Sequence, residues 1–281
     1  NSLFEELGLT DEVITIPKAH QKKFLYNGSD LVSPIKQLLR APKASLFKEV
    51  FFPLLKEPWL SKIDSDESIE NFFMRRFGKK ITQELVYPMV SGIYGSDPAN
   101  LSMRGCFPLI TELEKRGSSL LSSLIRYQKK APSKLISFKK GIQSLVDALA
   151  HQLKTETHLN SKVKSIQWQD SCPIVETDQM SYECEAVFST LPAHCLKPLL
   201  PAIQAPFYFP KACSLVVVNV GYKSKDLIPP GFGYLMKHGL SPDYIGALFD
   251  SKLFPQQNRS SQSTRLTLMF RDLGNHFSQK E

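Results

Sequence analysis

The sequence predicts an α+β protein in which a helical lobe is inserted between segments that carry strands. From 33 to 130, apolar residues recur at the spacing of amphipathic helices, for example at Ile69, Phe72, Phe73 and Phe77. From Cys213 onward, runs of β-branched and aromatic residues alternate with turns rich in Pro, Gly, Ser and Asn. A chain of 281 residues with 42% hydrophobic and 22% charged residues is long enough to bury a core in two or three lobes.

Residues 1–34 are expected to form a short helix, a strand and a hairpin. Leu3, Phe4 and Leu7 share one helical face, and Gly8 is placed to cap it. A short strand is predicted over 13–16. The dipeptide Asn27-Gly28, between the runs 23–26 and 31–32, is typical of a hairpin turn.

Residues 35–132 are expected to be helical. Val50 lies in an apolar stripe that continues through Leu46 and Leu54, and Asp64-x-x-Glu67 resembles a capping box ahead of a helix that Gly78 ends. Further helices are predicted over 79–89, from Pro108 to Gly117, and over 118–130. Such aromatic-rich helices with basic flanks either enclose an internal core, which explains most of these apolar positions, or lie in a bilayer interface.

The stretch 90–108 joins two of these helices and organises the chain. Gly92 and Gly95 bracket Ile93 and Tyr94, and a backbone without side chains can lie flush against a flat ligand. Asp97 is then forced out of helical geometry by the proline that follows it. Pattern alone favours an ordinary helix–helix linker.

Residues 133–203 are expected to form a helix over 142–149 and short strands over 163–166, 174–177 and 186–190. Residues 204–281 are expected to form strands over 213–220, 231–236, 244–251 and 265–270. The last group makes an antiparallel sheet, one face of which can floor a pocket.

Composition limits the class of partner. The net charge of +8 favours an acidic partner, such as a carboxylated substrate or an anionic membrane surface, and no nucleic-acid-binding motif accompanies it. The five cysteines are scattered and contain no CxxC, so we expect reduced thiols in the cytosol. Neither a metal-binding spacing, a signal peptide nor a run of bilayer-spanning length is apparent.

The stretch Val90-Ser-Gly-Ile-Tyr-Gly-Ser-Asp-Pro-Ala-Asn-Leu-Ser-Met-Arg-Gly-Cys-Phe-Pro108 resembles the segment that lines the tetrapyrrole site of flavin-dependent protoporphyrinogen oxidases. Four other stretches, 24–26, 137–149, 231–235 and 246–251, occur along the chain in the same order as in that family. The resemblance runs from the first residues to about Phe270. It implies that 1–34 and 204–281 belong to the substrate domain and that 133–203 is a partial FAD-binding segment. It also implies that 35–132 is a membrane-docking lobe, so we expect this lobe to have a core within and one exposed apolar face.

The resemblance implies FAD-dependent oxidation of protoporphyrinogen IX or coproporphyrinogen III in heme biosynthesis, with hydride transfer to flavin. The backbone carbonyl of Gly92 would then face the ring N–H groups, and no acid or base side chain would be required. The substrate-binding residues it implies are Lys23, Gly92, Gly95, Phe232, Leu235, Leu248 and Met269. It places Lys23 against a propionate, although a solvated edge lysine explains this residue equally well, and the backbone of Val163 at the adenine end of FAD, where a plain core valine is the alternative.

The pattern departs from the family in three places. No GxGxxG occurs in the chain and the C-terminal flavin segment is missing, so we expect an internal portion with little oxidase activity in isolation. Lys140 also occupies the first position of the glycine pair of the family.

The partners expected are a porphyrinogen, a membrane surface met by the helical lobe, and a second copy in a homodimer, with no nucleic acid. The location expected is the cytoplasm, at the inner face of a membrane. Two alternatives remain open: a flavin amine oxidase or desaturase acting on another apolar substrate, and a non-catalytic module that binds tetrapyrrole or membrane.

Overall fold

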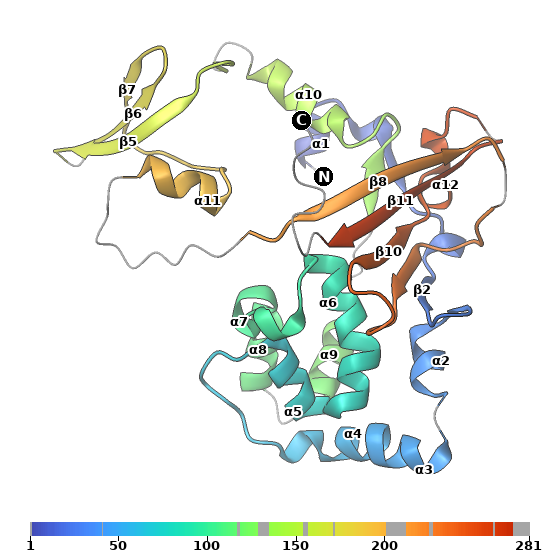
Figure 1. Cartoon of the computed structure of the whole chain (residues 1–281). Coiled ribbons are helices and arrows are strands. Elements are labelled where there is room, and N and C mark those ends of the chain that lie inside the picture. Colours follow the sequence, from blue (N-terminus) through green and yellow to red (C-terminus); the bar gives the residue numbers. More distant parts are fainter. Residues whose placement is uncertain are drawn as a thin grey trace. The chain divides into compact units, whose positions relative to one another are not determined.

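The computed structural model describes residues 2–40, 42–116, 119–128, 135–153, 157–170, 172–200, 212–224, 227–260 and 262–271. The chain divides into two units (Figure 1). The first consists of residues 1–144 and 214–281, and the second of residues 145–213. The second unit therefore interrupts the first in sequence.

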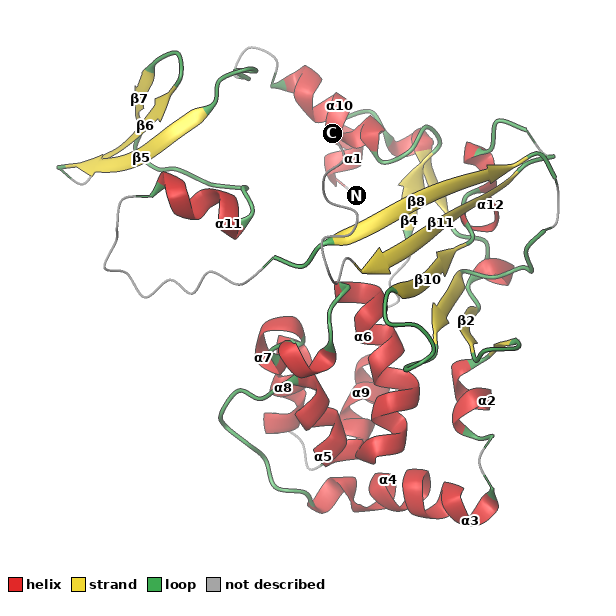
Figure 2. Cartoon of the chain, in the orientation of Figure 1, coloured by secondary structure: helices red, strands yellow, loops and turns green. Residues whose placement is uncertain are grey.

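A six-stranded sheet forms one half of the first unit, in the strand order β3-β2-β9-β10-β11-β8 (Figure 2). Its strands are β2 (Lys23–Tyr26), β3 (Leu31–Val32), β8 (Leu215–Tyr222), β9 (Gly233–Met236), β10 (Tyr244–Leu248) and β11 (Thr264–Arg271). Neighbouring strands are antiparallel, except that β2 runs parallel to β9. This parallel pairing brings the N-terminal hairpin into the C-terminal sheet and makes the sheet mixed.

A two-stranded ribbon stands beside this sheet in the same unit. β1 (Val13–Thr15) pairs antiparallel with β4 (Ile136–Phe138), and the Phe138 ring meets Phe4 of α1 (Ser2–Glu6) edge to face. Gln257, which follows α12 (Asp250–Leu253), donates from Nε2 to Phe138 O at 2.8 Å. The ribbon is therefore tied to the C-terminal part of the unit.

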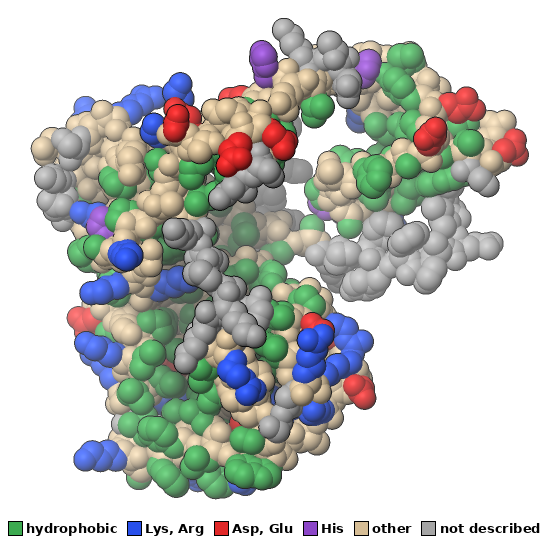
Figure 3. All heavy atoms as spheres, turned by 180° about the vertical axis from the view of Figure 1, so that it is seen from behind, with side chains coloured by type: hydrophobic (Ala, Val, Ile, Leu, Met, Phe, Trp, Pro, Cys, Tyr) green, Lys and Arg blue, Asp and Glu red, His purple; other side chains and the backbone are tan. Residues whose placement is uncertain are grey.

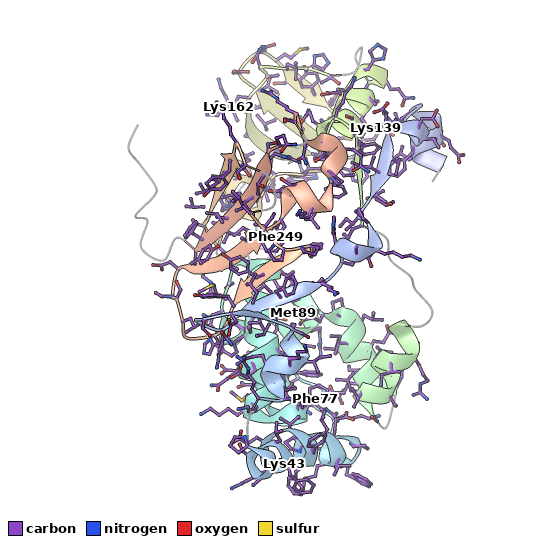
Figure 4. The ribbon with its side chains drawn as sticks, turned by 90° about the vertical axis from the view of Figure 1, so that its right-hand side faces the viewer. Lys43, Phe77, Met89, Lys139, Lys162 and Phe249 are labelled. Carbon is purple, nitrogen blue, oxygen red and sulfur yellow. The ribbon has the colours of Figure 1, made fainter. Side chains whose placement is uncertain are left out.

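Helices make up the other half of the first unit. They are α2 (Pro34–Leu38), α3 (Lys43–Leu46), a π-helical turn (Phe47–Phe51), α4 (Phe52–Lys56), α5 (Ile69–Ile81), a second π-helical turn (Thr82–Val86), α6 (Tyr87–Tyr94), α7 (Met103–Cys106), α8 (Pro108–Arg116) and α9 (Leu120–Gln128). Val50, Ile69, Phe72 and Phe77 are buried in a common core, as predicted, and α6 contacts β9 and β10. Figure 4 shows Phe77 among these helices and Met89 where they meet the sheet.

Helix boundaries follow the predicted signals in part. The chain breaks its helical geometry at Gly78, with φ 80° and ψ 170°, as predicted. The residue that caps α5 is Ser68, whose Oγ accepts from Asn71 N at 3.1 Å, so the capping role expected of Asp64 was wrong. The helix expected to end at Met89 continues through Gly92 to Tyr94 and stops only at Gly95, which takes the left-handed conformation with φ 65°. Gly117 lies outside the described residues.

The second unit contains a three-stranded antiparallel sheet. α10 (Gln143–Gln152) crosses the boundary, and β5 (Val163–Gln169), β6 (Cys172–Thr177) and β7 (Ser181–Glu183) follow, then α11 (Ala193–Leu196). The strand expected over 186–190 was wrong, since β7 ends at Glu183. Extended residues need a ladder partner to become a strand, and no described strand pairs with 186–190.

Within the described part of the chain, no helix has the length and apolarity that crossing a bilayer requires. The described residues also contain no group of three or more His, Cys, Asp or Glu placed to hold a metal ion. The five cysteines, all of which lie among the described residues, form no disulfide with one another.

Candidate functional site

An apolar cavity of about 460 Å³ lies between α6 and the six-stranded sheet. Its volume is in the range of sites for mid-sized organic ligands. Lys23 is the one charged residue among the described residues that line it. The lining consists of Lys23, Phe24, Leu25, Pro34, Leu85, Pro88, Met89, Gly92, Ile93, Phe232, Gly233, Tyr234, Leu235, Ala247, Leu248 and Met269.

The floor of the cavity is shaped by glycines that stand opposite large side chains. Gly246 of β10 lies between Leu235 of β9 and Met269 of β11, and Leu248 faces Gly233. Residues directly opposite in an antiparallel pair share a face, so the large side chains stand apart with hollows between them. Gly246 has φ 156°, and a Cβ there would lie 2.2 Å from Tyr234 O. Only glycine fits this position.

The roof of the cavity is one face of the helix that ends in α6. Leu85, Met89 and Ile93 recur at a spacing of four and therefore lie on one side, with Gly92 beside them. A Cβ on Gly92 would lie 2.5 Å from Leu235 Cδ2, so the missing side chain is what lets α6 approach the sheet this closely. Ile93 is left 60% exposed above the floor.

The carbonyl group of Gly92 belongs to the last turn of α6. Carbonyls at this position have no intrahelical partner because the helix ends before the residue that would donate to them. The backbone bond that closes α6 runs from Gly95 N to Ser91 O at 2.9 Å, and no described backbone N–H donates to Gly92 O outside the helix. This acceptor therefore remains available beside the cavity.

Lys23 stands at the rim of the cavity. Its alternation along β2 puts it on the same face as Leu25, and its backbone is opposite Gly233 of β9. The Nζ atom lies 5.5 Å from the centroid of the Phe232 ring, within the reach of a cation–π contact. An apolar slot with one ammonium group at its edge suits a flat apolar molecule that carries a carboxylate.

Six of the residues singled out in the sequence meet here: Lys23, Gly92, Phe232, Leu235, Leu248 and Met269. Gly95 does not line the cavity, because it forms the helix end and a Cβ on it would meet Leu215 Cδ2 at 2.5 Å. Val163 belongs to the second unit, where it opens β5 opposite Thr177. Met89 and Ile93 were missed as lining residues, although their spacing of four with Leu85 was the signal that would have found them.

Comparison with known proteins places the chain among flavoproteins. The family model described as flavin containing amine oxidoreductase matches residues 1–281. Protoporphyrinogen oxidase of Homo sapiens is 31% identical over 304 residues, which cover 95% of this chain and 62% of that protein. The Bos taurus protein of the same name is 30% identical with the same coverage. The chain thus spans about three fifths of the length of these relatives.

Solved structures share the fold. A crystal structure from Exiguobacterium sp. 255-15, provisionally named a protoporphyrinogen oxidase, superposes with a TM-score of 0.77 at 19% identity and covers 96% of this chain and 62% of its own. Reduced UDP-galactopyranose mutase follows with a TM-score of 0.66 at 14% identity, over 97% of this chain and 61% of its own. At these identities the likeness concerns the fold alone. Since the family model covers the whole chain, the chain belongs to the flavin-containing amine oxidoreductase family.

Proposed function

We propose that the cavity between α6 and the sheet binds the macrocycle of a porphyrinogen, and that the complete protein oxidises it to the porphyrin. One observation carries the proposal: an apolar slot of about 460 Å³ has a single ammonium group at its rim and Gly92, at the end of α6, in its roof. The names of relatives about 30% identical over 95% of the chain support the same substrate.

The residues of this chain bind and orient the substrate in this proposal. Phe232, Leu248 and Met269 pack against the ring faces and exclude water. Gly92 O accepts a hydrogen bond from a pyrrole N–H, which fixes the macrocycle against α6. The Lys23 ammonium group pairs with one propionate, as a point charge without the two-pronged geometry of arginine.

FAD is the cofactor that family membership implies. The described residues fit only part of it. Val163 offers extended backbone at the start of β5, but no GxGxxG loop exists in the sequence to cradle the pyrophosphate. Because the sequence offers no such loop for the pyrophosphate, the proposal assigns to this chain the binding and orientation of the substrate.

Titration with mesoporphyrin, followed by porphyrin fluorescence, tests the slot. Replacing Gly92 with Leu drives Leu235 into the cavity, and we expect affinity to fall at least tenfold, or about 1.4 kcal/mol. Lys23→Met should weaken binding of the dicarboxylate about two- to fivefold, as expected for an exposed ion pair, and leave the dimethyl ester unaffected.

Lys22→Met is the matched control, because Lys22 is an exposed lysine that precedes β2 and is not among the residues that line the cavity. Unchanged mesoporphyrin affinity in the Gly92→Leu protein would reject the slot. Binding of an apolar amine or a polyene in preference to mesoporphyrin would instead favour an amine oxidase or desaturase.

A second proposal concerns the helical lobe, which we infer docks on an anionic membrane surface. Large apolar side chains are exposed along its outer helices: Ile35, Leu39, Phe47, Phe51, Phe52, Leu55 and Trp59. Figure 3 shows hydrophobic side chains gathered at the lower end of the view, over α3 and α4, with basic residues nearby. Lys43 lies at this end in Figure 4, and Lys56 Nζ stands 4.3 Å from the Phe52 ring centroid. An aromatic face edged by lysines is typical of interfacial docking.

The two tryptophans of the chain give a matched test of docking. Trp59 is 83% exposed in the apolar face, and Trp168 is 51% exposed in the second unit. With Trp168→Phe, fluorescence reports Trp59 alone, and we expect a blue shift on adding phosphatidylcholine vesicles that contain phosphatidylglycerol. In the Trp59→Phe protein, the emission maximum of Trp168 should not shift when the vesicles are added. A shift at both tryptophans, or at neither, would contradict docking through this face.

A further inference from the structure

A second cavity, of about 240 Å³, lies on the other side of α6, where β9, β10 and β11 reach their ends. Tyr87 and Ser91 of α6 form one wall, His238 of the β9–β10 hairpin forms another, and Arg271 at the end of β11 closes the third. α6 turns Met89 and Gly92 toward the larger cavity and Tyr87 and Ser91 toward this one. Pro88 is the single residue that lines both, so the two sites are separate.

Arg271 is the polar group that this cavity leaves incompletely paired. Its Nη2 donates to Ser91 Oγ, but its Nε is buried without a hydrogen-bond partner. Among the described residues, no carboxylate lies within 4 Å of the guanidinium group. A buried donor without a partner destabilises the folded state, and more so when it is charged. Unlike Nε, which is closed to a ligand, Nη1 is not among the buried atoms and has no hydrogen-bond partner among the described residues, so it can donate to an anion in the cavity.

Most of the other polar groups around the cavity already have partners. Lys237 Nζ lies 3.1 Å from Glu84 Oε1, and Asp97 Oδ1 accepts from Ala99 N at 2.9 Å. Tyr87 donates from its hydroxyl to Glu70 Oε1 at 2.8 Å, and the hydroxyls of Tyr244 and Tyr234 share a 2.8 Å hydrogen bond. Arg271 is therefore the cationic group left to recognise an anion, with the His238 ring beside it in the lining.

The walls determine what kind of anion fits. The Tyr87 ring lies against the His238 ring with centroids 4.0 Å apart, and Met236, Pro242 and Ile245 add apolar surface. Such walls favour a ligand with a short apolar or aromatic body. The presence of Asp97 in the lining disfavours a doubly charged phosphate and leaves a monoanion as the better match. Guanidinium geometry suits the two oxygens of a carboxylate.

We propose that this cavity is a binding site for a small organic monocarboxylate, recognised by Arg271 and enclosed by the rings of Tyr87 and His238. The site is independent of the porphyrinogen slot and rests on none of its residues except the shared wall at Pro88.

Benzoate is the probe for the test, with the full chain as the protein. Calorimetric titration should give benzoate binding to the unchanged chain and at least tenfold weaker binding of the neutral isostere benzamide. Arg271→Met should weaken benzoate binding at least tenfold. Arg259→Met, which removes an exposed arginine elsewhere, should leave it unchanged. Arg271→Lys keeps the positive charge but loses the two-pronged guanidinium geometry. Its affinity for benzoate should therefore lie between that of the unchanged chain and that of Arg271→Met.

A measurement on the unchanged protein keeps the test independent of folding of the variants. Benzoate should shift the NMR signal of the His238 imidazole and no other histidine. Equal binding of benzoate and benzamide, retention of benzoate affinity in a folded Arg271→Met protein, or the absence of a shift at His238 would each overturn the proposal. Tighter binding of inorganic phosphate than of benzoate would also overturn it.

Discussion

Glycines decide the shape of the larger cavity at the level of single residues. Gly92 removes the side chain that would otherwise press on Leu235, and Gly246 occupies a conformation closed to other residues. The sequence drew attention to Gly92 and Gly95 as one bend, yet Gly92 is helical and Gly95 alone turns the chain. The modest cost of glycine in a helix is overridden here by the packing of α6 on the sheet.

Replacing Gly246 with Ala should destabilise the protein by at least about 2 kcal/mol, because strain at positive φ adds to the collision of the new Cβ with Tyr234 O. Urea denaturation followed by circular dichroism measures the difference. Gly221→Ala is the control: Gly221 has no positive φ and nothing lies within 4 Å of its Cβ position, so we expect a much smaller change. Equal effects of the two substitutions would refute the strain argument.

A buried ionic cluster joins the helices at the level of elements. Arg76 of α5 is 2% exposed and bonds to Glu114 of α8 through Nε at 2.7 Å. Its Nη1 lies 3.4 Å from Oε1 of Glu57, which is fully buried. The same oxygen accepts from Leu120 N at 2.8 Å, so Glu57 also caps α9 from another segment. Periodicity in the sequence predicted the helices, whereas this cluster joins residues 38 and 19 positions apart and carries no local signal.

Arg76→Met should cost about 3–5 kcal/mol, because it leaves Glu57 buried without its cation and Glu114 with Arg75 as its remaining cationic partner. Urea denaturation again gives the value. The control is Arg116→Met, which breaks an exposed pair with Glu112 four residues earlier on α8 and should cost no more than about 0.5 kcal/mol. If Arg76→Met cost no more than the control, the cluster would not hold the helices together.

Charge acts on the molecule as a whole through pH. The net charge of +8 rises as carboxylates take up protons, which adds self-repulsion in acid. Asp66 contributes specifically: the hydrogen bond from Ser102 Oγ, aided by the bond from Arg104 N, outweighs burial and holds its pKa below the usual 3.8. A carboxylate with a lowered pKa in the folded state stabilises that state above its unfolded pKa and loses this contribution as pH falls through the folded value.

The unfolding free energy of the unchanged protein should therefore decline as pH drops below about 4. The unfolding free energy of the Asp66→Asn protein should decline less steeply over the same interval. Above pH 5, Asp66→Asn should be the less stable of the two proteins. Urea denaturation at pH 3, 4, 5 and 7 measures both trends. Parallel pH profiles for the two proteins would show that Asp66 does not contribute to acid sensitivity.

Local patterning determined most of the helices and many of the strands of this protein, because the periods of 3.6 and 2 follow from backbone geometry within a few residues. The core residues Ile69, Phe72 and Phe77 could be identified on that basis. Tertiary structure alone decided that β2 pairs in parallel with β9, across more than 200 residues, and that residues 186–190 acquire no strand partner among the described residues. It also decided which face of α6 roofs the larger cavity and which closes over Arg271. Pairings between distant segments depend on contacts whose energies exist only once the chain has folded.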